Sequence, residues 1–152
     1  MFDLFGEMTA EEINKTAEGL KNEGDTENVY ALAKENGISK EFVEMYLQGD
    51  IPALCDAMTA AVGKLDVEMG EKDVKAYSRK IPAEPIVEYL KQKAMEDEAV
   101  AVKIREKGKS LAGCLKHVES EARKKVSREK PYLADAVVYR MARDYYMKEA
   151  VK

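Results

Sequence analysis

The sequence predicts an all-α protein, and three observations carry that prediction. Apolar residues recur at helical spacing along most of the chain. Gly and Pro, which interrupt helices, number only 9 and 4 among 152 residues. Charged residues make up 36% of the chain, which suits helices that bury one stripe and expose a wide polar face. We expect about six to seven short amphipathic helices and no sheet, since no segment sustains the period-2 alternation of a half-buried strand.

The first part of the chain carries the start and stop signals of three helices. Thr9 and Glu12 form the pattern of a capping box, in which each side chain accepts from the other's backbone N–H. This helix is expected to end near Gly24, a residue suited to a left-handed C-terminal cap. A second helix follows and ends at Gly37, after which Ser39 is expected to cap a third.

The chain divides at a mostly polar stretch. Residues 53–62 are apolar on most sides and are expected at the centre of the N-terminal unit. Glycines and prolines bracket the polar stretch that follows, which indicates a connector with some helix in it. We predict an acidic helical unit over residues 1–70, a connector over 71–83 and a basic helical unit over 84–152.

The second unit shows a clearer helical pattern. A helix is expected from Glu84, with a bend near residues 96–97, as far as Gly108. Ser110 then caps the most regular amphipathic helix, and a last helix begins near Ala134. The apolar residues of the helix after Ser110 step by three or four: Leu111, Leu115, Val118, Ala122 and Val126.

Charge is distributed unevenly between the two units. The formal net charge is −4, but residues 1–70 hold 15 acidic and 5 basic side chains, whereas residues 71–152 hold 14 acidic and 20 basic ones. An asymmetry of this kind points to charged partners. Two ordinary solvated surfaces that differ in charge are the alternative.

The acidic unit contains the spacing of a helix-turn-helix over residues 33–43, with Gly37 at the turn and Ile38 as an apolar plug. A recognition helix beside phosphates needs hydrogen-bond donors and positive charge. The second helix here instead exposes Glu41 and Glu44. The acidic face that carries these two residues therefore favours a basic protein surface, or structural packing, over DNA.

The basic unit contains a stripe of cations with a seven-residue spacing, which keeps side chains on one slowly drifting helix face. Its candidate partner-binding residues are Lys109, Lys116, Arg123, Lys124 and Lys130. The stripe can contact phosphates, an acidic protein groove or water alone. The spacing of Glu119 and Arg123 fits a helix-supporting ion pair, which favours the last of these.

No residue pattern nominates catalysis, a metal or a cofactor. Cys55 and Cys114 lie inside apolar helical patterns, where a free thiol behaves as a small hydrophobe. His117 follows Cys114 by three residues, but zinc requires three or four ligands. We expect no metal, no cofactor and no enzymatic activity, because no recognisable catalytic constellation is present.

Two further expectations concern the compartment. No stretch reaches the roughly 18 apolar residues that cross a bilayer. Only two cysteines are present and neither suggests a disulfide framework, so the reducing cytoplasm is the expected location. We expect a soluble protein with no membrane partner.

Three segments of the second unit carry a family resemblance: KGKSLAGCLKHV at residues 107–118, EARKK at 121–125 and VVYRMARDYY at 137–146. Through them, residues 84–152 resemble the PcfK-like family. Its members occur on conjugative plasmids, integrated elements and phages of bacteria, and some short members are anti-CRISPR proteins that inhibit the RNA-guided nuclease of type II-A systems. The acidic residues 33–49 look like the N-terminal extension of longer members.

The resemblance implies a small non-enzymatic helical protein of a mobile element. The partner it implies is a bacterial protein or nucleoprotein, with the type II-A nuclease as the leading candidate. A nucleic-acid-binding accessory protein of conjugation, acting through the basic stripe, is the alternative. A homo-oligomer held by the opposite charges of the two units is a third.

Overall fold

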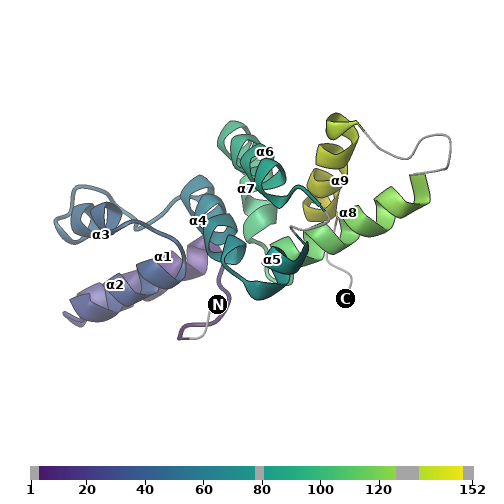
Figure 1. Cartoon of the computed structure of the whole chain (residues 1–152). Coiled ribbons are helices and arrows are strands. Elements are labelled where there is room, and N and C mark those ends of the chain that lie inside the picture. Colours follow the sequence, from purple (N-terminus) through teal and green to yellow (C-terminus); the bar gives the residue numbers. More distant parts are fainter. Residues whose placement is uncertain (1–3, 78–80, 126–133, 149–152) are drawn as a thin grey trace.

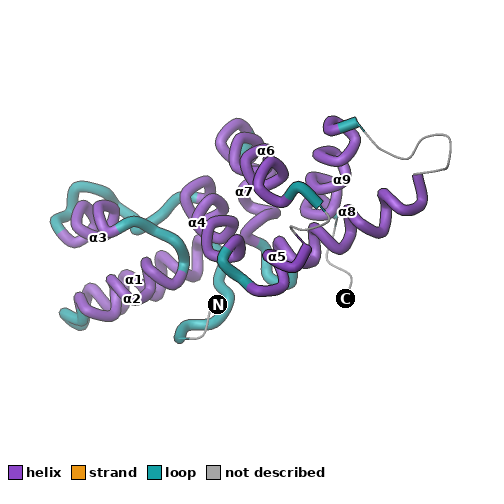
Figure 2. Tube along the Cα trace, viewed as in Figure 1, coloured by secondary structure: helices purple, strands orange, loops and turns teal. Residues whose placement is uncertain are grey.

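The computed structural model describes residues 4–77, 81–125 and 134–148. Within these ranges the chain forms nine α-helices and no strand (Figure 2). The all-α prediction is confirmed, but the expected count of six to seven helices is too low. The helices are α1 (Ala10–Asn22), α2 (Thr26–Glu35), α3 (Lys40–Leu47), α4 (Ala57–Met69), α5 (Lys72–Tyr77), α6 (Ala83–Glu96), α7 (Glu98–Arg105), α8 (Leu111–Lys125) and α9 (Asp135–Met147).

The predicted capping box begins α1. The backbone N–H of Glu12 donates to the Thr9 hydroxyl at 3.3 Å, and the Thr9 N–H donates to the Glu12 carboxylate at the same distance. The helix ends before Gly24, whose φ of +76° lies in the left-handed region that glycine adopts without strain. Asp25 then caps α2, since its carboxylate accepts from the Asn28 N–H at 3.2 Å.

Two helices add to the segments predicted individually: one lies in the connector, where some helix was expected, and one follows a break that the apolar pattern does not reveal. The predicted connector contains α5, whose Val74 is fully buried. The predicted bend near residues 96–97 is a complete break, because Asp97 adopts an extended backbone with φ of −142°. Its carboxylate accepts from the Ala99 N–H at 2.9 Å, so that Asp97 ends α6 and caps α7.

A close backbone contact joins the turn between α2 and α3 to α4. Gly63 lies in the interior of α4, and a Cβ placed there would lie 2.3 Å from the carbonyl oxygen of Asn36. A Cβ placed on Gly37 would likewise lie 2.3 Å from the carbonyl oxygen of Gly63. Both positions therefore require glycine for this approach.

Buried side chains form two clusters that meet inside α4. The first cluster joins α1, α2, α3 and the start of α4 as far as Ala60, and the second extends from Ala61 to Tyr146. Figure 1 shows α4 between α1–α3 on one side and α6–α9 on the other. The helix is thus shared by both cores. None of the helices in the described ranges is long and apolar enough to cross a membrane.

Candidate functional site

An acidic face covers α1–α3. Its exposed carboxylates are those of Glu11, Glu18, Glu23, Glu27, Glu41 and Glu44. Exposed lysines offset part of this charge: Lys15, which pairs with Glu11 at 3.8 Å, Lys34 and Lys40. The other two lysines of residues 1–70 turn inward, since Lys64 is fully buried and Lys21 lies 4.7 Å from the Tyr46 ring centroid and donates to the Tyr46 carbonyl at 3.1 Å. These helices therefore expose more negative than positive charge.

The helix-turn-helix spacing corresponds to α2 and α3. Gly37 adopts the left-handed backbone of the turn and Ile38 is buried, as expected from the sequence. Ser39 occupies the N-cap position of α3, but its side chain makes no capping hydrogen bond, which corrects that part of the prediction. Glu41 and Glu44 are exposed on α3, so the helix that would face DNA in a reader carries negative charge.

The basic stripe is only partly assembled. Lys116, Arg123 and Lys124 are exposed on α8, whereas Lys130 lies outside the described residues. Arg123 pairs with Glu119 at 2.5 Å, and the Lys124 ammonium lies 3.1 Å from a carboxylate oxygen of Glu121. Two cations of the stripe are therefore neutralised within their own helix, as i,i+3 and i,i+4 pairs commonly are.

Lys109 is not part of the exposed stripe, and its predicted role as a surface cation is wrong. The residue is 7% exposed, and its ammonium donates to the carbonyl oxygens of Tyr145 at 2.9 Å and Lys148 at 2.7 Å. It lies in the loop before α8, so the seven-residue spacing of the helix does not extend to it. Lys109 instead donates to free carbonyl groups at the C-terminal end of α9. A helix C-terminus carries partial negative charge and therefore favours a nearby cation.

A buried polar cluster, which the sequence did not reveal, lies where α4, α7 and the loop before α8 meet. The ammonium of Lys64 donates to the carbonyl oxygens of Lys109 at 2.7 Å, Ile104 at 3.0 Å and Glu106 at 3.3 Å. It also pairs with the Glu7 carboxylate at 3.3 Å. Burial lowers the pKa of Lys64, while Glu68 and Glu7 oppose this shift.

Arg105 extends the same cluster toward the N-terminal core. Its guanidinium donates to the carbonyl oxygens of Met8 at 2.6 Å and Ala60 at 3.3 Å, and to the side-chain oxygen of Asn36. Glu68 extends the cluster toward α8, where its carboxylate accepts from the Leu111 N–H at 3.1 Å. The three charged groups thus satisfy helix ends and backbone carbonyls, which is a structural task.

Glu68 has an altered titration. Burial raises its pKa to about 7, although the nearby Lys64 ammonium acts in the opposite direction. The spacing of Lys64 and Glu68, four residues apart on one helix, was the only sequence signal for this pair. That spacing usually describes an exposed helix-supporting pair, so it did not indicate burial.

The thiols and the histidine do not form a reactive group. Burial raises the pKa of Cys55 to about 11 and raises that of Cys114 further, so both thiols stay protonated at neutral pH. The Cys114 thiol lies 3.7 Å from the Ala142 carbonyl oxygen, and partial burial lowers the pKa of His117. In the described ranges, no group of three His, Cys, Asp or Glu side chains is placed to hold a metal ion.

Comparison with known proteins found a family similarity in the second part of the chain. Residues 79–152 match the family model described as PcfK-like protein. The matched residues contain α6, α7, α8 and α9, which include the helix of the basic stripe. The curated proteins and the solved structures contain no match to the chain.

Proposed function

We propose that this chain, whose residues 79–152 match the family model described as PcfK-like protein, is a non-catalytic binding protein of a mobile genetic element or phage. We further propose that it inhibits a type II-A RNA-guided nuclease, as an anti-CRISPR protein does. One observation carries the proposal: exposed carboxylates cover α1–α3, with Glu41 and Glu44 on the helix next to the turn.

The proposed mechanism is electrostatic competition. An RNA-guided nuclease holds the guide–target heteroduplex in a positively charged channel and recognises the nucleic-acid backbone there. A rigid surface with outward carboxylates can occupy such a channel in place of phosphates, because opposite potentials attract and steer association. The basic α8 then remains available for acidic protein or guide RNA at the channel edge.

The buried groups support a binding role over a catalytic one. The Lys64 ammonium and the Arg105 guanidinium donate to backbone carbonyls, and both thiols are protonated. A nucleophile needs an activating base and an exposed approach. We therefore assign the chain's activity to its surface.

Charge reversal tests this proposal. Glu41→Lys combined with Glu44→Lys removes two negative charges from an exposed helix face and adds two positive ones. Both side chains are exposed, so folding should be preserved. Affinity for an immobilised guide-loaded type II-A nuclease, measured by surface plasmon resonance, is expected to fall about tenfold or more. Asp73→Lys with Asp144→Lys provides the matched control, since both carboxylates are exposed on the opposite part of the molecule. Equal loss in both double variants would contradict a specific acidic face.

The second candidate function is direct nucleic-acid binding through α8, favoured by the exposed Lys116, which forms no ion pair within the described residues, with Arg123 and Lys124 on the same helix. Binding through phosphates predicts a steep fall of affinity as salt rises, because counterions are released. Lys116→Glu with Arg123→Glu is expected to abolish a low-salt gel shift. Absence of any complex with the unaltered protein at low salt would rule out this function.

A further inference from the structure

Large apolar side chains are exposed at one junction of the fold. In the described residues, Met58 is 38% exposed, Met95 is 58% exposed and Val102 is 53% exposed. They come from α4, α6 and α7, respectively. The fourth exposed large apolar residue, Leu4, precedes α1 and lies apart from this group. A concentration of exposed apolar residues often marks an interaction surface.

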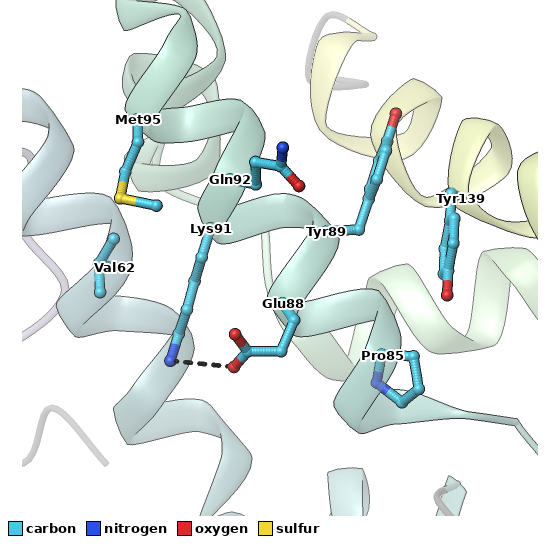
Figure 3. Close-up of a pocket in the computed structure, with 8 residues that line it drawn as sticks. All are labelled: Val62, Pro85, Glu88, Tyr89, Lys91, Gln92, Met95 and Tyr139. Carbon is cyan, nitrogen blue, oxygen red and sulfur yellow. Dashed lines mark ion pairs between the residues drawn. The ribbon is translucent and has the colours of Figure 1, made fainter.

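Three hollows lie in series across this junction. The largest, of about 610 Å³, lies on the outer face of α6 between α4 and α9 (Figure 3). A second, of about 240 Å³, shares Met95 with it and adds Met58. A third, of about 350 Å³, shares Ala57 with the second and adds Val102. Because each hollow shares a lining residue with the next, we treat the three as one surface from Tyr139 to Val102, here named the Met95 groove.

The walls of the groove differ in stiffness. At one end the rings of Tyr89 and Tyr139 stack, with centroids 4.9 Å apart and planes 11° from parallel. Figure 3 shows these rings beside each other, while Met95 points toward Val62 of α4. Stacked rings provide a rigid apolar surface, and methionine adapts to irregular partners. The groove thus combines a rigid aromatic end, at Tyr89 and Tyr139, with a flexible apolar side chain, Met95.

The rim of the groove is acidic. The carboxylates of Asp56 and Glu98 border its middle and form no ion pair within the described part of the chain. Glu11 and Glu106 border one end and Glu88 the other, and each has a lysine partner: Lys15, Lys103 and Lys91, respectively. The lining cations are Lys91, which is half-buried and also pairs with Asp66 at 2.5 Å, and Arg105, which is buried. The carboxylates in the middle of the groove therefore favour a positively charged occupant.

We propose that the Met95 groove binds an amphipathic α-helix of a partner protein, with apolar anchors along one face and Lys or Arg along its flanks. Neighbouring hollows can each receive one apolar anchor from a helix that presents its anchors at positions i, i+4 and i+7. An extended peptide is less suited, because it adds to the exposed edge of a sheet and the described part of this chain has none. The groove lies mainly on α4, α6, α7 and α9 and reaches the start of α1 at Glu11, but it includes neither Glu41 nor Glu44, so this inference does not depend on those two residues of the acidic face.

A labelled peptide tests the proposal. The probe is a helical peptide with leucines at i, i+4 and i+7 and lysines on its flanks, titrated with the full chain by fluorescence anisotropy. We expect saturable binding that weakens at least tenfold in Met58→Ser with Met95→Ser. Both side chains are exposed, so the double variant should retain its circular dichroism spectrum.

Two controls separate this groove from the acidic face. Glu41→Lys with Glu44→Lys should leave peptide affinity unchanged, and a peptide with glutamates in place of the lysines should bind at least tenfold more weakly. The proposal is overturned by absence of saturable binding, by unchanged affinity in the methionine double variant, or by loss confined to the Glu41 and Glu44 variant. It is also overturned if light scattering shows a dimer that Met58→Ser with Met95→Ser disperses, because a second copy would then occupy the groove.

Discussion

The ammonium of Lys64 lies 2.7 Å from the carbonyl oxygen of Lys109, which joins the middle of α4 to the loop before α8. Lys109 in turn donates to carbonyls at the end of α9. Two lysines thus connect the helix shared by both cores to the last helix of the structure. Neither charge is available to a partner, although both were counted among the cations of the sequence.

Replacement of Lys64 by Met should reduce the free energy of unfolding by about 3 kcal/mol, because three carbonyl oxygens and the Glu7 carboxylate lose their donor. Urea denaturation followed by circular dichroism measures the change. Lys15→Met is the matched control, since that lysine is exposed and forms only a 3.8 Å pair with Glu11. The control should alter stability by less than about 0.5 kcal/mol.

Glu68 should make stability depend on pH. Its folded pKa of about 7 exceeds the ordinary value of 4.5, so the folded state holds the proton more tightly than the unfolded chain does. Its stabilising contribution is complete below pH 4.5 and is lost as pH rises through about 7. The unaltered protein should therefore lose about 1–3 kcal/mol relative to Glu68→Gln between pH 5 and 8. Parallel pH profiles of melting temperature for the two proteins would contradict this assignment.

Gly63→Ala should destabilise the protein by about 2 kcal/mol or more, because the added Cβ would lie 2.3 Å from the Asn36 carbonyl oxygen and force the turn away from α4. Gly19→Ala is the matched control: it also lies in a helix interior, but nothing lies within 4 Å of its added Cβ. Helix propensity predicts a gain of up to about 1 kcal/mol for the control. Chemical denaturation of both variants tests the pair, and equal effects would contradict the close contact.

The two thiols should react slowly in the folded protein. Burial raises the pKa of Cys55 to about 11 and that of Cys114 further, and the reactive thiolate is therefore scarce at neutral pH. Titration with a chromogenic disulfide reagent at pH 7.5 should label neither residue rapidly, and both should react once denaturant unfolds the chain. Rapid labelling of the folded protein would show that one thiol is accessible.

Helix boundaries followed well from local chemistry. Thr9 with Glu12, Gly24 and Ser110 each act where the sequence predicted, since caps depend on residues only a few positions apart. The connector was expected to contain some helix and contains α5, but the complete break at Asp97 did not follow from the sequence. Whether Asp97 bends a helix or ends it depends on how α6 and α7 pack against α4, and the sequence pattern contains no record of that packing.

The surfaces were less predictable than the helices. Exposure of Glu41 and Glu44 agrees with the predicted acidic face, because helical spacing alone places them opposite Val43 and Tyr46. The inward turn of Lys109 and the burial of Lys64 could not be predicted in this way. Their carbonyl acceptors lie 36 to 45 positions away in the sequence, so only the folded arrangement reveals them.

The central claim, that the acidic face of α1–α3 occupies a basic surface of an RNA-guided nuclease, is tested most directly by target cleavage. A guide-loaded type II-A nuclease is incubated with the purified chain before target DNA is added. We predict that a near-equimolar amount of the chain slows cleavage. The Glu41→Lys with Glu44→Lys variant should leave cleavage at the rate of the nuclease alone, and the unaltered chain added after the target is bound should have little effect. Unchanged cleavage across several type II-A nucleases would contradict the account.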